Sequence, residues 1–347
     1  MKKFSVKSKI IIYLIVIIIL GLVGFKFYTN KLISDNLNIK IVPLLHTDYP
    51  QLQEVLKKRI LLVGLKRAYE VTGKEIEKIP LSMQREVMFF FGIQAYRLKG
   101  LNAMAICDAR YKYGCFHGVF NRAVAEKGLA FATVADNECK KYQKEPDLGL
   151  SCYHGIGRAL MYSGGEKNLS KILEKCTQMS WKGTLFGCRD GVFIEYHFPF
   201  LLQQKTISTI KQFEESNPYD PCPTVPSDAK RDCYYIIPLW WFNALGQDYE
   251  RMGSLCNALS NQQDKEACFV GIGRGVVALG NDSVEEALKA CSSMPGSESR
   301  KLCLAAAHWT FLDRSKAEIL CNSIPQEDRA DCKDISKLEK RVVYTNL

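Results

Sequence analysis

The stretch SCYHGIGRALMY at residues 151–162 is the clearest copy of a phrase that recurs along this chain of 347 residues. The other copies, some less complete, each start at a cysteine: Cys115, Cys188, Cys233, Cys268 and Cys303. Successive copies are 35 to 45 residues apart, which is typical of repeats built from two helices. The recurrence therefore predicts an all-α protein made of about six or seven α/α helical hairpins.

Every copy is preceded by another cysteine 8 to 13 residues earlier, and one more pair follows the last copy. The seven pairs are Cys107 and Cys115, Cys139 and Cys152, Cys176 and Cys188, Cys222 and Cys233, Cys256 and Cys268, Cys291 and Cys303, and Cys321 and Cys332. Zinc sites favour Cys-x2-4-Cys spacing, which is absent. The strict pairing therefore predicts seven local disulfides, formed in an oxidising compartment.

The N-terminus predicts a membrane anchor. Residues 10–25 carry no charge and follow four lysines, while Lys26 ends the apolar run. Sixteen residues of helix span about 24 Å, which reaches across a bilayer if Lys9 and Lys26 extend toward the headgroups. A cleaved signal peptide is the alternative, but no Ala-x-Ala cleavage site follows the run, which favours an uncleaved anchor. Because more positive charge precedes this segment than follows it, we expect a single-pass protein with a cytoplasmic N-terminus and an extracytoplasmic body, in the periplasm or at the cell surface.

Three parts are expected along the chain. Residues 1–30 form the cytoplasmic tail and the signal-anchor transmembrane helix, residues 31–100 a helical cap without cysteines, and residues 101–347 the cysteine-paired repeats. Within the cap, apolar spacing predicts one helix from Gln51 to about Gly73 and another that starts at Ser82, its N-cap, and ends at Gly100.

Each repeat is expected to contain a first helix with its cysteine near the C-terminal end, a stapled loop, and a second helix. The second helix should begin at the second cysteine and end at a glycine: Gly128, Gly164, Gly246 or Gly280. A further glycine recurs three positions after the second cysteine, at Gly118, Gly155, Gly191 and Gly271. A helical glycine costs about 1 kcal/mol relative to alanine, so this position predicts close packing near the helix start, against a neighbouring second helix or against the stapled loop.

This pattern of period, hairpin and one cysteine pair per unit resembles the tetratricopeptide and Sel1-like class of α/α repeats, especially its disulfide-stapled, exported members. The resemblance covers residues 101 to about 335. It implies a superhelix with a binding surface, and a closed α/α toroid is the alternative. No catalytic residue is implied by it.

The candidate site residues occupy equivalent positions in successive second helices. His117, His154 and Asp190 stand two positions after their cysteines, and this composition could hold a divalent metal such as zinc. Asn121, Arg158 and Arg274 stand six positions after theirs. A recurring arginine needs a partner, which we expect to be either a carboxylate of a neighbouring unit, such as Glu195, or an anionic ligand. Two aromatic residues of one second helix, Trp240 and Trp241, could form a platform for a peptide or a sugar.

Composition and missing motifs narrow the function. The net charge is +10, but the lysines and arginines are spread along the chain, so no nucleic-acid partner is expected. No nucleophile elbow, phosphate loop, dinucleotide fingerprint or His-Glu-x-x-His motif occurs. We therefore expect a binding or scaffold module for a protein or an anionic envelope polymer, without a cofactor. The alternative is a metal-dependent hydrolase or lyase in an α/α ring that uses His117, His154 and Asp190 as ligands.

Overall fold

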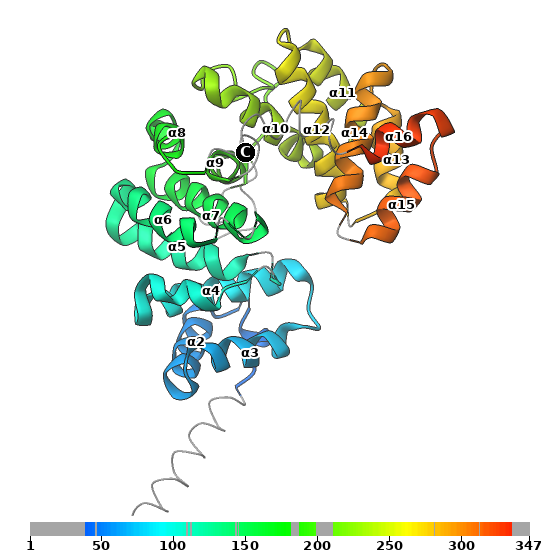
Figure 1. Cartoon of the computed structure of the whole chain (residues 1–347). Coiled ribbons are helices and arrows are strands. Elements are labelled where there is room, and N and C mark those ends of the chain that lie inside the picture. The colour runs from blue at the N-terminus through cyan, green and yellow to red at the C-terminus, as the bar shows by residue number, and fades with distance from the viewer. Residues whose placement is uncertain are drawn as a thin grey trace, which may run out of the picture. The chain divides into compact units, whose positions relative to one another are not determined.

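The computed structural model describes ten segments of the chain: residues 39–45, 47–108, 110–111, 113–142, 144, 146–181, 187–198, 211–280, 282–311 and 313–334. All regular elements in these segments are helices, which confirms the predicted all-α class (Figure 1). The predicted membrane anchor, residues 10–25, lies outside the described residues. Among the residues that are described, no helix is long and apolar enough to cross a membrane.

Two compact units divide the chain, residues 1–119 and residues 120–347. Within the described part of unit 1 lie η1 (Val42–Leu44), α2 (Tyr49–Val63), α3 (Leu65–Ile76), α4 (Leu81–Lys99), η2 (Gly100–Ile106) and the start of α5 (Gly114–Lys127), which crosses the boundary.

The helices of unit 1 differ from the prediction in two places. The single helix expected from Gln51 to Gly73 is wrong, because Gly64 adopts a φ of +79° and separates α2 from α3. Ser82 is not the N-cap of the next helix, since α4 begins at Leu81 directly after Pro80. The predicted end of that helix at Gly100 is confirmed, with a φ of +58°.

Unit 2 is a succession of first and second helices (Figure 1). The first helices are α6 (Phe131–Cys139), α8 (Leu169–Thr177), α11 (Tyr249–Ala258), α13 (Val284–Ser292) and α15 (Arg314–Asn322). The second helices are α7 (Pro146–Gly164), α9 (Cys188–His197), α10 (Lys230–Ala244), α12 (Gln262–Leu279), α14 (Ser297–Thr310) and the short α16 (Arg329–Lys333). Short 3-10 turns join several of them: η3 (Gly128–Ala130), η4 (Lys140–Tyr142), η5 (Glu166–Asn168), η6 (Ser227–Ala229) and η7 (Gln326–Asp328). Consecutive second helices pack against one another, α7 on α9, α9 on α10, α10 on α12, and α12 on α14.

All seven predicted disulfides are present, and no cysteine is free. Their Cα–Cα distances lie between 5.4 and 5.7 Å, within the usual range. Five of them join the C-terminal end of a first helix to a second helix, as expected. The other two start outside an α-helix, because Cys107 follows η2 and Cys222 lies in a turn.

The second helices do not generally begin at their cysteine, so this part of the prediction is wrong. α7, α12 and α14 each begin six residues earlier, and α10 begins three residues earlier. Local capping explains the start of α12, because the Asn261 side chain accepts hydrogen bonds from the backbone N–H groups of Gln263 and Asp264. The stapled loops are correspondingly shorter than expected.

The expected close packing at glycine is confirmed at three of the four positions. A Cβ atom added to Gly118 would lie 2.0 Å from the carbonyl oxygen of Phe89 in α4, and one added to Gly191 would lie 2.0 Å from that of His154 in α7. The corresponding distance from Gly271 to the Tyr235 carbonyl in α10 is 2.2 Å. Gly155 is buried. The glycine of one second helix therefore sits directly on the backbone of the preceding one.

A second glycine, five positions after the cysteine, makes the reciprocal contact. A Cβ atom on Gly157 of α7 would lie 1.8 Å from the Cys188 carbonyl oxygen of α9, and one on Gly273 of α12 would lie 2.1 Å from the Cys303 carbonyl oxygen of α14. In α7 and α9, the two glycines thus face each other's backbone. These contacts set how closely the second helices approach and place their side chains in register.

Candidate functional site

Six polar or charged side chains from four second helices meet in unit 2. This group, called the polar cluster below, consists of His154 and Arg158 from α7, Asp190 and Glu195 from α9, Tyr235 from α10, and Arg274 from α12. Tyr235 and the five predicted candidates all come from the repeated phrase.

The Arg158 guanidinium pairs with the Glu195 carboxylate of the next second helix. Its Nε and Nη2 atoms donate to Oε2 of Glu195 at 2.9 and 2.6 Å, and Nη2 lies 3.5 Å from the carbonyl oxygen of Phe198. Both charged side chains are almost completely buried, at 3% and 1% exposed. The predicted partner of Arg158, a carboxylate on a neighbouring unit, is thereby confirmed.

Asp190 joins three helices. Nδ1 of His154 lies 2.7 Å from its Oδ2 atom, and Nη1 of Arg274 donates to its Oδ1 atom at 2.9 Å. The Arg274 guanidinium also lies over the Tyr235 ring, 5.1 Å from the ring centroid. Arg274 therefore contacts the neighbouring helix α10 through Tyr235 and reaches past it to pair with Asp190 of α9.

Burial and these partners shift the pKa values of the cluster. Burial alone would raise the pKa of Asp190, but Arg274 and His154 outweigh it and hold that pKa at about 2. Burial lowers the pKa of His154, and the neighbouring Asp190 only partly offsets this. At neutral pH the imidazole is accordingly uncharged and donates its Nδ1–H to the carboxylate. Burial by itself would lower the pKa of Arg274, but Asp190 raises it, so the guanidinium stays charged.

The helix dipole explains only one of these positions. Asp190 lies in the first turn of α9, where a carboxylate complements the positive helix terminus. His154 lies well inside α7, because that helix begins at Pro146. A helix start at the second cysteine, as predicted, would place both residues in a first turn, and this is wrong for His154 because α7 starts six residues before Cys152.

The remaining members of the predicted set lie elsewhere. His117 is buried in α5, and its Nδ1 atom is 3.3 Å from Nη2 of Arg85 in α4. It belongs to unit 1, whereas His154 and Asp190 belong to unit 2. Asn121 is also buried in α5, and its Nδ2 atom has no hydrogen-bond partner among the described residues.

The two predicted platform tryptophans are interior residues, with Trp240 1% and Trp241 0% exposed. Trp240 donates its indole N–H to the carbonyl oxygen of Lys211 at 2.5 Å, and Trp241 donates to that of Pro218 at 2.9 Å. Both bonds fasten the segment before α10 to that helix. The Trp240 ring also stacks on His197, with centroids 5.0 Å apart and planes 14° from parallel.

Two of the pockets on the described surface lie near predicted or charged residues. One, of about 440 Å³, lies between α2 and α4 in unit 1, and Glu54, Lys57 and Arg97 are among its lining residues. The other, of about 230 Å³, lies beside Trp240 and is lined also by Lys211 and Asp220. Neither includes a member of the polar cluster.

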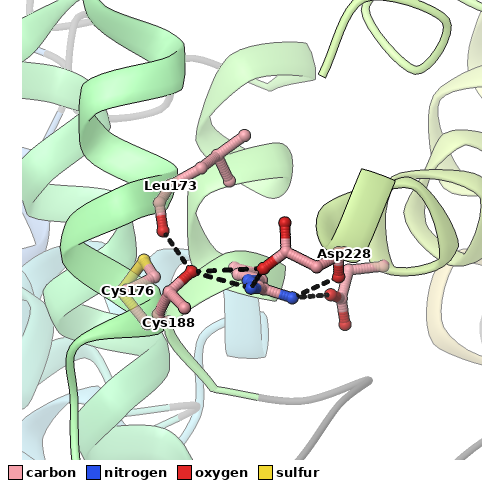
Figure 2. Close-up of polar contacts among 7 residues, drawn as sticks. Leu173, Cys176, Cys188 and Asp228 are labelled. Carbon is pink, nitrogen blue, oxygen red and sulfur yellow. Dashed lines mark hydrogen bonds and ion pairs between the residues drawn. A yellow bond between two sulfur atoms is a disulfide. The ribbon is translucent and has the colours of Figure 1, made fainter. Parts of the chain in front are cut away.

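Sequence reasoning missed a second ionic group, at the start of α9. Arg189 donates to the Thr177 hydroxyl at 2.8 Å and to Oδ2 of Asp232 at 3.1 Å, and it pairs closely with the carboxylate and backbone carbonyl of Asp228. Figure 2 shows these contacts near the disulfide of Cys176 and Cys188. Thr177, Arg189, Asp228 and Asp232 are called the Arg189 cluster below.

One signal in the sequence could have revealed this group. The position directly after the second cysteine is hydrophobic or aromatic in the other copies: Phe116, Tyr153, Tyr234, Phe269 and Leu304. Arginine stands there only in the copy at Cys188, and a charge at an otherwise apolar repeat position needs a partner.

The polar cluster is suited to fasten helices together. Each of its charged groups has an opposite charge within 3 Å, and both carboxylate oxygens of Asp190 are engaged. Within the described residues, no group of three or more His, Cys, Asp or Glu side chains is arranged to hold a metal ion. The cluster thus joins α7, α9, α10 and α12 through buried charge-assisted contacts.

Comparison with known proteins gives no family. No protein-family model, no curated protein and no solved structure matches this chain.

Proposed function

We propose that this chain is a membrane-anchored, extracytoplasmic scaffold of the Sel1- and tetratricopeptide-like kind, a superhelical repeat whose body binds a protein partner. One observation supports this above the others. The charged residues that first suggested chemistry, Arg158, Asp190, Glu195 and Arg274, are paired with one another across the second helices. Groups used in this way stiffen a framework, which is what a scaffold needs.

The same pairing favours a protein over an anionic polymer as partner. Binding of a polyanion requires several accessible cations, but the Arg158 side chain is 3% exposed and Arg274 18%, and both face carboxylates. The net charge of +10 also gives little support, because six of the lysines lie in residues 1–38, outside the described body.

The oxidised state supports the extracytoplasmic location. Seven disulfides without a single free cysteine form and persist in oxidising compartments, and they are rare in the cytosol. The apolar run at residues 10–25 would supply the anchor.

Topology can be tested by cysteine labelling, since the wild-type chain offers no free thiol as background. Leu61 is 61% exposed on α2, so Leu61→Cys should react with a membrane-impermeant maleimide in cells whose cytoplasmic membrane is intact. The matched variant Ser5→Cys, before the apolar run, should react only after that membrane is lysed. Labelling of Ser5→Cys in intact cells, or protection of Leu61→Cys, would overturn the proposed orientation.

Partner binding can be tested with photo-cross-linking amino acids in the producing cell. We expect probes at some exposed positions, such as Leu61, Val134 and Ile319, to give one defined protein adduct. Reduction of the disulfides before irradiation should abolish that adduct, because the surface depends on the folded repeats. The proposal fails if no surface probe yields an adduct, or if the adducts survive reduction unchanged.

A further inference from the structure

The junction of α9 and α10 lacks the glycine contacts that join α7 to α9, α10 to α12, and α12 to α14. The glycine positions are occupied there by Phe193, five residues after Cys188, and Ile236, three residues after Cys233. Both side chains are fully buried. These two side chains stand where the other junctions have glycine, so the backbones of α9 and α10 cannot approach each other in the same way. The contact of α9 with α10 is accordingly less extensive than its contact with α7.

Different contacts hold the two ends of this junction. At the C-terminal end of α9, His197 stacks on Trp240 of α10 in a fully buried aromatic contact. At the N-terminal end, the Arg189 cluster connects α9 to η6 and to the first turn of α10 (Figure 2). Next to it, the buried Asp190–Arg274 pair of the polar cluster connects α9 to α12 across the same junction, so opening at this end also breaks that pair. In the first contact the imidazole is uncharged near neutral pH, because burial lowers the pKa of His197 to about 3, whereas the second contact includes ion pairs of Arg189.

We propose that the α9–α10 junction is a hinge of unit 2, which pivots on the His197–Trp240 stack and is latched at its other end by the Arg189 cluster. Opening separates the described residues 146–198 from residues 227–334. This inference concerns the body alone and does not rest on the proposed partner.

The latch contains a buried carboxyl group that is poorly suited to carry a charge. The Asp232 residue is 2% exposed, and its Oδ1 atom has no hydrogen-bond partner among the described residues. Burial raises its pKa to about 7, although Arg189 and Arg231 oppose the rise and Asp190 adds to it. Asp228 of η6 pairs with the same arginine.

The closed latch therefore becomes less stable as pH rises. In the closed state the pKa of Asp232 is about 7, above the ordinary value of an aspartate. The neutral carboxyl therefore favours the closed state fully at pH values below the ordinary pKa, and this stabilisation is lost as the pH rises through about 7. In an opened, hydrated latch the carboxyl would ionise near pH 4. Between pH 6 and pH 8 the opening equilibrium should increase roughly tenfold. Added salt should act in the same direction, because Asp228 is exposed and its pairing with Arg189 is screened.

Hydrogen exchange of the oxidised full chain tests the hinge. After correction for intrinsic exchange rates, hydrogen-bonded amides in the N-terminal halves of α9 and α10 should exchange roughly tenfold faster at pH 8 than at pH 6. Amides at the glycine-paired junction of α12 and α14 should not change. The variant Asp232→Asn, which stays neutral, should lose the pH dependence and keep wild-type pH 6 protection at both values.

Arg189→Gln should open the latch at both pH values. The matched control is Lys301→Gln, which removes an ion pair at another junction, the 2.8 Å contact of Lys301 in α14 with Asp331 in α16. This variant should leave the exchange rates of α9 and α10 unaffected. Persistence of the pH dependence in Asp232→Asn, or wild-type protection in Arg189→Gln, would refute the hinge.

Discussion

At the scale of single residues, the Arg158–Glu195 pair is almost completely removed from water, and its two charged groups are well placed to hydrogen-bond to each other. Two hydrogen bonds from one guanidinium to one carboxylate oxygen satisfy charges that are almost inaccessible to water. Such a pair adds little relative to a well-packed apolar pair, but removal of one partner leaves an uncompensated buried charge. The pair thus makes the contact between α7 and α9 specific.

Glu195→Gln should consequently destabilise the oxidised protein by about 3–5 kcal/mol, because Arg158 remains buried without its counter-charge. The control Glu126→Gln breaks the half-exposed pair of Arg122 and Glu126 on α5 and should cost only about 0.5 kcal/mol. Denaturant unfolding followed by circular dichroism gives both values. If both variants lost the same free energy of unfolding, the buried pair would contribute no more to stability than the half-exposed pair.

The sequence could predict the Arg158–Glu195 pair because both residues lie at repeated positions of adjacent units. It could not predict that Arg274 pairs with Asp190, since this contact crosses the intervening helix α10 and depends on where the Tyr235 ring lies. The Arg189 cluster was missed because two of its members precede or open α10 in a segment without a repeat pattern. The repeat position marks Arg189 as unusual, but the spacing does not identify its partners.

At the scale of the helices, the glycine pairs determine how closely α7 approaches α9. The repeated glycine position indicated close packing, and the structure shows what each glycine contacts. Gly157 lies against the backbone carbonyl of Cys188, and Gly191 lies against that of His154. The helix starts could not be predicted in the same way. They depend on capping groups such as Asn261, which lie outside the repeated phrase.

Two glycine substitutions of the same kind should have opposite effects. Gly157→Ala would place a Cβ atom 1.8 Å from the Cys188 carbonyl oxygen, so α7 and α9 must separate, at a cost of about 3 kcal/mol. Gly275→Ala, in α12, places its Cβ atom 3.6 Å from the nearest Leu239 atom and should stabilise by about 1 kcal/mol through helix propensity. Thermal unfolding of both variants separates the cost of a backbone clash, expected for Gly157→Ala, from the gain in helix propensity, expected for Gly275→Ala. A similar effect of both would argue against backbone contact.

At the scale of the whole molecule, the disulfides are distributed evenly along the repeats instead of linking distant parts. The cysteine pairing was fully predictable, because seven consecutive pairs at similar spacing leave no sensible alternative. The division at residues 119 and 120, inside α5, was not predictable, since the repeated phrase continues across it. A periodic sequence shows what recurs but not where the chain divides into compact units.

Reduction should unfold the body. Each disulfide closes a short loop worth roughly 3 kcal/mol in the chain-entropy model, and seven together exceed the net stability of an ordinary domain, about 5–15 kcal/mol. We expect loss of helical circular dichroism after treatment with reductant and alkylation. Alkylation without reductant should modify no cysteine and leave the spectrum unchanged. A folded, fully reduced protein would contradict this expectation.

The order of the disulfides also bears on how the molecule is made. Each cysteine bonds to the next one along the chain, 8 to 13 residues away, and no bond encloses another. A chain that emerges N-terminus first into an oxidising compartment would present each pair in its correct order. A thiol oxidase that joins cysteines as they appear would therefore build the native set directly, without an isomerase to rearrange wrong bonds.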